Sequence, residues 1–301
     1  NSVLKPLTKQ KNFYIFSSKS LLTDETLSCL KWLGRERNSM NSIVITANLK
    51  KAISIGFHES CIVPFPESVG GRYSIWSPIS LSAGIENNFS SFLKGGFSAD
   101  QMILGTSKED KQYQKFIKML AFSDLWFSNF KNKKNRVVLS YNWKLRSLAN
   151  YVQQLEMESL GKKSNPRSIF QNTGQSIFGG FGSTAQHSYF QLLHQGTSEF
   201  CADIIFCPIK NSPLSSAQAR GQAQLLSSTQ RSLVNSIEFS NGNAPVNLFT
   251  LPSLTLSSLG FLLASWEHRV FVTASMLQIN PFDQFGVKAG KMAAKSLLNK
   301  Q

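Results

Sequence analysis

The sequence predicts an α/β protein made of two doubly wound units, each built on a parallel sheet. Short β-rich runs alternate with stretches of helical period, and this spacing is typical of parallel sheets. A polar stretch at residues 107–117 separates two such series and predicts a domain boundary. Hydrophobic residues make up 42% of the 301 residues, which is enough to build a core in each unit.

The first series opens with a strand expected at residues 12–17, where aromatic and β-branched residues are bounded by polar ones. A helix follows at 23–33, because its leucines repeat at helical spacing. Thr23 is the expected N-cap of this helix, since its hydroxyl can accept a hydrogen bond from the first turn. The series continues with a strand at 42–46, a helix at 50–55 and a strand at 60–65.

The second series repeats this alternation over the rest of the chain. Its expected strands lie at 136–140, 202–206, 247–250 and 270–273. Its expected helices lie at 143–158, 186–195, 215–233, 255–267 and 286–299. Residues 161–185 and 208–218 are rich in Gly, Ser and Asn, and we expect loops there.

Composition excludes several classes of protein. The 32 Lys and Arg residues against 17 Asp and Glu give a net charge of +15, but the basic residues are scattered. A nucleic-acid binder therefore ranks last among the hypotheses. The four cysteines have no CxxC spacing, so neither a zinc site nor a disulfide framework is expected, and a reducing compartment fits best. The longest apolar run, residues 259–266, is too short to span a membrane.

Two segments of the first series are candidates for anion binding. Residues 17–23 place hydroxyls, Lys19 and free backbone N–H groups between a strand and a helix N-terminus. Ordinary turn and capping chemistry is the simpler explanation of this segment alone. Residues 69–77 place Arg72 after a Gly-Gly turn, where the backbone can pass close to a ligand and the guanidinium can hold an oxyanion. A surface arginine in a turn is the alternative.

Three segments of the second series carry candidate acid–base groups. Gln154 and Glu158 are four residues apart on one helix face, and Glu158 could act as a general base or be a solvated glutamate. His187 is expected in the first turn of a helix, where the dipole disfavours its protonation. Gln284 and Lys291 are two helical turns apart in a basic C-terminal segment, which could also pack as a plain amphipathic helix.

The order and spacing of these segments resemble those of the glucose-6-phosphate isomerase family. The resemblance runs from about residue 10 to the C-terminus and rests on residues 18–23, 69–77, 154–159, 186–197, 266–272 and 282–287. It implies two SIS-type (sugar-isomerase) units, each a doubly wound parallel sheet in a three-layer αβα sandwich. The expected divisions are 1–106 for the C-terminal part of a first, incomplete unit, 107–280 for the second unit and 281–301 for a C-terminal helix.

The resemblance also implies a role for each candidate residue. Glu158 would move the proton between C1 and C2 of the sugar, and Arg72 would stabilise the enediolate. His187 and Lys291 would assist ring opening, with His187 contributed to the neighbouring subunit's site in a homodimer. The residues that would bind the sugar phosphate are Ser18, Lys19, Ser20, Thr23, Gln154 and Gln284. No metal and no cofactor is implied.

The implied function is the interconversion of glucose 6-phosphate and fructose 6-phosphate through a cis-enediol(ate), in cytoplasmic glycolysis and gluconeogenesis. The sequence departs from the family in two places that bear on activity. The family's upstream Gly-rich phosphate loop is absent from these residues, and Lys288 stands where the family has a glutamate. The alternative is therefore a non-catalytic, SIS-type sugar-phosphate-binding protein or an inactive fragment.

Overall fold

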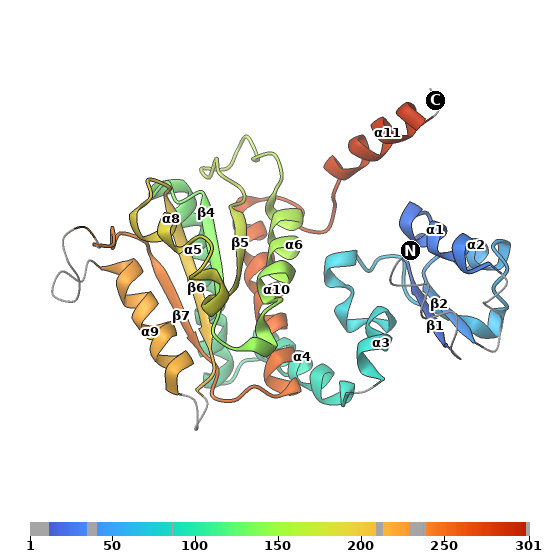
Figure 1. Cartoon of the computed structure of the whole chain (residues 1–301), viewed down its shortest axis with the longest axis horizontal. Coiled ribbons are helices and arrows are strands. Elements are labelled where there is room, and N and C mark those ends of the chain that lie inside the picture. Colours follow the sequence, from blue (N-terminus) through green and yellow to red (C-terminus); the bar gives the residue numbers. More distant parts are fainter. Residues whose placement is uncertain are drawn as a thin grey trace. The chain divides into compact units, whose positions relative to one another are not determined.

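The computed structural model describes residues 12–34, 41–85, 87–208, 213–228, 237 and 239–298. The chain divides into two compact units, Asn1–Phe89 and Ser90–Gln301. Both units carry parallel sheets with covering helices (Figure 1), so the predicted α/β class with parallel sheets is confirmed. Within the described residues, no helix is both long enough and apolar enough to cross a membrane.

The first unit contains a three-stranded parallel sheet in the order β1-β2-β3. The strands are β1 (Tyr14–Ser17), β2 (Ser42–Thr46) and β3 (Ile62–Pro64), and the helices are α1 (Asp24–Leu33), α2 (Leu49–Ser54) and α3 (Leu81–Gly84). Residues from β1, β2, α1 and α2 form its apolar core, in which Leu21 and Val44 are fully buried. The predicted strands and helices of this unit are thus confirmed, and all three strands end at the same edge of the sheet.

The second unit contains a four-stranded parallel sheet in the order β5-β4-β6-β7. Its strands are β4 (Asn135–Ser140), β5 (Ser176–Phe181), β6 (Phe200–Phe206) and β7 (Val246–Thr250). Its helices are α4 (Phe89–Leu104), α5 (Lys108–Phe130), α6 (Leu148–Leu160), α7 (Gly182–Ala185), α8 (Phe190–Gln195), α9 (Pro213–Ser227), α10 (Leu256–Leu277) and α11 (Gly286–Leu298). Chain order reverses between β4 and β6, which is the pattern of a doubly wound sheet.

Alternate residues of the central strands serve two different layers. On one face of the sheet, Val137 and Leu139 of β4 join Ala202 and Ile204 of β6 in an apolar core with α8 and α9. The side chains of Arg136 on β4 and Asp203 on β6 lie on the opposite face of the sheet. There they contact charged residues of α5, α6 and α10. The second unit is therefore a three-layer αβα sandwich with an apolar layer and a charged layer.

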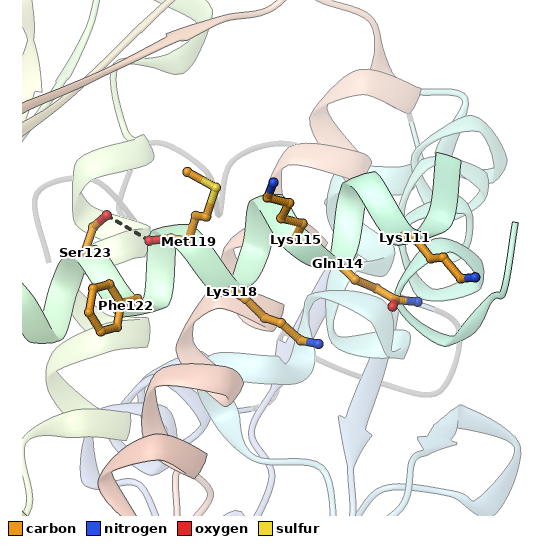
Figure 2. A pocket seen from close by; sticks show the side chains of 7 residues that line it. All are labelled: Lys111, Gln114, Lys115, Lys118, Met119, Phe122 and Ser123. Atoms are coloured by element: carbon orange, nitrogen blue, oxygen red, sulfur yellow. Dashed lines mark hydrogen bonds between the residues drawn. The ribbon is translucent and has the colours of Figure 1, made fainter. Parts of the chain in front are cut away.

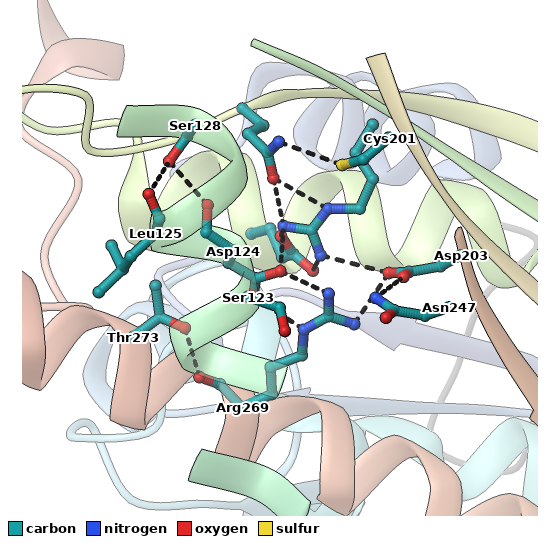
Figure 3. Close-up of polar contacts among 12 residues, drawn as sticks. Ser123, Asp124, Leu125, Ser128, Cys201, Asp203, Asn247, Arg269 and Thr273 are labelled. Atoms are coloured by element: carbon teal, nitrogen blue, oxygen red, sulfur yellow. Dashed lines mark hydrogen bonds and ion pairs between the residues drawn. The ribbon is translucent and has the colours of Figure 1, made fainter. Parts of the chain in front are cut away.

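The charged layer is a buried network of two arginines and three carboxylates (Figure 3). Arg136 lies 3.0 Å from Asp124 of α5, 3.1 Å from Glu156 of α6 and 3.3 Å from Asp203 of β6. Arg269 of α10 donates to Asp124 at 2.5 Å and to Asp203 at 2.8 Å. All five side chains are at most 6% exposed, so each charge depends on its partners rather than on water.

Two carboxyls of this network have pKa values shifted in opposite directions. Burial alone would raise the pKa of Asp203, but the guanidinium groups of Arg269 and Arg136 outweigh it and hold that pKa below its ordinary value. For Glu156, burial outweighs the attraction of the same two arginines and raises the pKa. The Trp266 indole N–H donates to Glu156 at 2.7 Å and completes its environment.

One predicted strand is wrong, because residues 270–273 lie inside helix α10. A reciprocal capping box between Thr255 and Ser258 starts this helix. Val270 and Thr273 are each 1% exposed at helical spacing, and the Thr273 hydroxyl donates to the Arg269 carbonyl at 2.8 Å. Packing against the sheet and the charged network therefore overrides the β preference of these residues.

Two predicted loops contain regular structure. The expected loop at 161–185 includes β5, in which Gly179 allows close approach, since a Cβ there would lie 1.9 Å from the Val138 carbonyl oxygen. The expected loop at 208–218 overlaps α9, which begins at Pro213. Glycine usually indicates a loop, whereas in β5 it serves the close packing of strands. Residues 229–233 and 299, the ends of two predicted helices, lie outside the described residues.

The division between the units falls ahead of the predicted boundary after residue 106. Helix α4 packs on α10, because a Cβ on Gly95 would lie 1.9 Å from the Ser257 carbonyl oxygen and one on Gly260 would lie 2.1 Å from the Phe92 carbonyl oxygen. The polar residues expected to mark the boundary instead open α5, where Ser107 and Asp110 form a capping box. Close helix contact thus places α4 in the second unit.

The charged network predicts that Asp203→Asn destabilises the second unit strongly. Removing one partner of a buried charge pair costs about 3–5 kcal/mol, because the arginines left behind stay out of water. Asp100→Asn, which alters an ion pair of an exposed carboxylate with His268, should cost at most about 1 kcal/mol. Urea unfolding followed by circular dichroism measures both, and equal effects would contradict a special role for the network.

The difference in unfolding free energy between wild type and Asp203→Asn should depend on pH. The deficit of Asp203→Asn should be complete above about pH 4, the ordinary pKa of an aspartate. It should shrink as the pH falls from there through the lowered pKa of Asp203, because wild type then loses the same charge. Urea unfolding repeated at a series of acidic pH values measures this change, and a deficit independent of pH would contradict it.

The contact between α4 and α10 predicts that Gly95→Ala destabilises the protein by about 1–3 kcal/mol, because the added methyl overlaps Ser257. Gly221→Ala in α9 is the matched control, since nothing lies within 4 Å of its Cβ position. That variant should gain about 0.5–1 kcal/mol from helix propensity. Thermal unfolding distinguishes the two, and a stabilised Gly95→Ala protein would refute the close contact.

Candidate active site

The loop between β1 and α1 holds four of the predicted phosphate-binding residues. Its backbone turns at Leu21, which has φ 51° and a fully buried side chain. The Ser18 hydroxyl accepts from the Leu21 N–H at 3.2 Å, and the Ser20 hydroxyl accepts from the Leu22 N–H at 3.2 Å. This left-handed turn is strained for leucine, so burial of the side chain and the serine hydrogen bonds must hold it.

Thr23 occupies the N-cap of α1, as predicted, but its side chain caps nothing among the described residues. Its hydroxyl lies 3.4 Å from that of Ser18 instead. The two hydroxyls lie on either side of the turn at Leu21 in the chain. Ser18 and Thr23 are therefore brought together, with Lys19 and Ser20 between them in the chain.

Three residues that sequence reasoning missed hold this loop at the end of β2. The Thr46 hydroxyl and the Ala47 N–H both donate to the Lys19 carbonyl at 3.0 Å. The Asn48 side-chain amide donates to the Ser20 carbonyl at 3.2 Å. The available signal was the parallel sheet itself, since polar residues that follow neighbouring parallel strands meet at one edge.

Arg72 lies in a short 3-10 helix, Gly71–Trp76, that follows β3. It is 3% exposed, and its guanidinium carbon lies 5.5 Å from the centre of the Tyr73 ring. A buried guanidinium is a strong donor to an oxyanion. Like the loop at 18–23, it follows the carboxyl end of a strand of the first sheet, which is where ligands bind in open α/β sheets.

In the second unit, Glu158 and Gln154 lie one turn apart on α6, as predicted. Glu158 is partly buried and Gln154 is exposed. Helix α6 ends at Leu160, and the Gly161 N–H caps it by donating to the Met157 carbonyl at 3.0 Å. The Glu158 carboxylate is therefore carried on the last turn of a helix whose other face belongs to the charged network.

Lys162 links the end of α6 to the segment before α11. Its ammonium donates to the Glu158 carbonyl at 2.6 Å and also to the Asp283 carbonyl. It pairs with the Asp283 carboxylate at 3.2 Å. Gln284, exposed, is next in the chain, so two of the predicted site segments are brought together here. Lys291 lies in α11, and its side chain is outside the described residues.

His187 does not lie in the first turn of a helix, so that expectation is wrong. It lies between α7 and α8, and its N–H donates to the Thr184 carbonyl at 3.1 Å. The Gly-rich strand β5 runs straight into α7, so the helix starts and ends before the histidine. Helix α8 begins only at Phe190, with Tyr189 as its N-cap, so His187 lies in the turn before that helix.

Glu158 and His187 lie at opposite ends of β5. Met157 contacts the start of this strand, since the Ile177 N–H lies 3.5 Å from its sulfur. His187 comes after the other end of the strand and after α7. At a rise of about 3.3 Å per residue, about 13 Å of strand lies between Ile177 and Phe181. Strand β5 therefore lies between the two residues along the chain.

A pocket on α5 contains none of the predicted site residues (Figure 2). It is lined by Lys111, Gln114, Lys115, Lys118, Met119, Phe122 and Ser123, all on that helix. Its lysines could hold an anion, but its lining includes no carboxylate and no imidazole to move a proton. It is not a candidate for proton-transfer chemistry.

Parallel sheets covered by helices, with polar loops after the strand ends, place the chain among the doubly wound α/β proteins. The chain belongs to the phosphoglucose isomerase family, whose model matches residues 1–301. The resemblance inferred from the sequence is thereby confirmed.

Curated relatives agree with the family. The glucose-6-phosphate isomerases of Shewanella halifaxensis and Shewanella pealeana are each 35% identical to this chain over 336 residues. Each match covers 99% of this chain and 61% of the relative, so the chain spans less than two thirds of the length of these relatives.

Solved structures show the same fold. A glucose-6-phosphate isomerase from Chlamydia trachomatis matches with a TM-score of 0.80 at 24% identity, covering 99% of this chain and 62% of that one. A hypothetical protein from Thermus thermophilus matches with a TM-score of 0.77 at 21% identity, covering 98% of this chain and 74% of that one.

The loop geometry predicts that Thr46→Val loosens the segment at 18–23. Thr46 is fully buried, and valine keeps its shape but removes the hydroxyl that donates to the Lys19 carbonyl and accepts from the Asn48 N–H, at a cost of about 0.5–1.5 kcal/mol for each bond. Hydrogen exchange by mass spectrometry should show faster exchange at Leu21 and Leu22. Thr26→Val on α1 is the control, and equal exchange in the two variants would contradict the role of Thr46.

Proposed function

We propose that this chain is an aldose–ketose isomerase that interconverts glucose 6-phosphate and fructose 6-phosphate through a cis-enediol(ate). Family membership over the whole chain is the observation that carries the proposal. The local geometry supports it, because hydroxyls and Lys19 gather in one loop, Arg72 is buried, and Glu158 stands on the last turn of α6. We place the reaction in glycolysis and gluconeogenesis in the cytoplasm.

The proposed roles follow the chemistry of each group. Glu158 takes the proton from one carbon and returns it to the next, and Arg72 stabilises the negative oxygen that forms. The serines and threonine at 18–23, with Lys19, hold the phosphate. Gln154 and Gln284 bind the sugar phosphate, and His187 and Lys291 assist opening of the sugar ring.

We further propose that the protein acts as a homodimer in which His187 serves the site of the neighbouring subunit. The placement of Glu158 near the start of β5 and of His187 after its end supports this arrangement, because the length of the strand lies between them within one chain. A histidine from a second copy need not span that length. No nucleic acid and no membrane enters this proposal.

A second candidate function is sugar-phosphate binding without turnover. The resemblance drawn from the sequence favours it, because Lys288 stands where the family is expected to have a glutamate. Binding needs only the phosphate loop and the sugar contacts, whereas isomerisation also needs the base and the ring-opening groups. Calorimetric binding of fructose 6-phosphate together with a turnover assay separates the two functions.

Glu158→Gln should abolish isomerisation while leaving the affinity for fructose 6-phosphate within about threefold. The amide keeps the size of the side chain but cannot accept the proton, and general-base catalysis typically contributes about 10²–10⁴-fold, so turnover should fall by about that factor or more. A coupled assay of glucose 6-phosphate formation measures this. Glu109→Gln, in the first turn of α5, is the control and should keep wild-type turnover. Unchanged turnover in Glu158→Gln would refute the assignment.

A further inference from the structure

The side chain of Lys162 contacts both the helix end that carries Glu158 and the segment that carries Gln284. Its ammonium donates to the carbonyls of Glu158 and Asp283 and pairs with the Asp283 carboxylate at 3.2 Å. The three oxygens match the three N–H donors of an ammonium group. One side chain therefore ties together two segments that are far apart in the chain.

The hydrogen bond from Lys162 satisfies the Glu158 backbone carbonyl, which has no hydrogen-bond partner within the helix. The last four carbonyls of α6 have no partner within the helix, and that of Glu158 is one of them. A cation at the C-terminus of a helix also interacts favourably with the helix dipole. Lys162 thus stabilises the last turn of α6 in the conformation that presents Glu158.

The backbone of Lys162 is itself held in place. Its N–H donates to the Leu160 carbonyl at 2.7 Å, and its carbonyl accepts from the Thr173 hydroxyl at 2.6 Å. The preceding Gly161 is required here, because a Cβ would lie 2.3 Å from the Met157 carbonyl oxygen. The backbone from which the Lys162 side chain extends is therefore held in one position.

Exposure argues that the contact serves geometry more than stability. The side chains of Lys162 and Asp283 are 16% and 26% exposed, so solvent screens part of their attraction. The hydrogen bonds to two main-chain carbonyls, in contrast, fix where two stretches of backbone lie relative to each other. Their effect is to set the spacing between Glu158 and Gln284.

We infer that Lys162 is a positioning residue. It clamps the segment at 281–285 to the end of α6 and thereby determines the position of Glu158 relative to Gln284. The inference rests on the proposed function for its catalytic consequence, but the clamp itself does not. Lys162 acts through the backbone of Glu158 and Asp283, and no contact with substrate is assigned to it.

The test compares Lys162→Met, Lys162→Arg and Lys163→Met in the full chain. Lys162→Met keeps the length of the side chain and removes the donor. Lys163→Met removes the same charge from the next residue, whose side chain is exposed. Lys162→Arg restores a donor of similar reach. Each protein is measured for kcat and KM with fructose 6-phosphate, and for hydrogen exchange at residues 282–285.

For Lys162→Met we expect kcat to fall about 10–100-fold with KM changed less than about threefold, because small misplacements of a catalytic group are costly. Exchange at 282–285 should be faster, while exchange in the first turns of α6 should stay the same. Lys162→Arg should recover part of both properties, and Lys163→Met should match wild type.

Three results would overturn the inference. Unchanged exchange at 282–285 in Lys162→Met would show that no clamp exists. Faster exchange with unchanged kcat would show a clamp that does not position Glu158. An equal loss of kcat in Lys163→Met would show that the effect comes from the change in net charge and not from the clamp. A wild-type chain without turnover would refute the proposed function separately, and the exchange data would still decide whether the clamp exists.

Discussion

The buried pairing of Arg136 and Arg269 with three carboxylates is the constraint on which the second unit depends. These five charges come from two strands and three helices, so no element can move without exposing or unpairing a charge. Apolar packing of the opposite layer is tolerant of small shifts, because it has no direction. Hydrogen-bonded ions are not tolerant, and they therefore specify the register between the sheet and its helices.

The same network explains which parts of the fold could be predicted from the sequence. Strand β2 has an unbroken apolar run that burial explains, and its prediction is confirmed. The segment around Arg269 looks like a strand by local preference, and only its partners on distant elements make it helical. Strand β5 was missed because its glycines allow close contact with Val138, which no local pattern reveals.

Some residues of the candidate site could likewise be predicted from local patterns, whereas others depend on contacts between distant parts of the chain. Ser18, Lys19, Ser20 and Thr23 could be predicted as a group, because a polar turn between a strand and a helix is a local pattern. The residues that hold this loop in place could not be predicted, because Thr46 comes close to the loop only through the pairing of parallel strands. His187 was predicted in the first turn of a helix at 186–195, whereas α8 begins only at Phe190 and His187 lies in the turn between α7 and α8.

Helix α6 connects the network to the proposed chemistry. Glu156 and Glu158 are two residues apart, so they point to different sides of the helix, at about 200° in projection. Glu156 is bound by Arg136 and by the Trp266 indole, and this fixes the rotation of α6 about its own axis. The direction of Glu158 follows from that rotation, and Lys162 fixes the helix end along the axis. The buried contacts of Glu156 and the contact of Lys162 with the helix end therefore jointly determine where the proposed base lies.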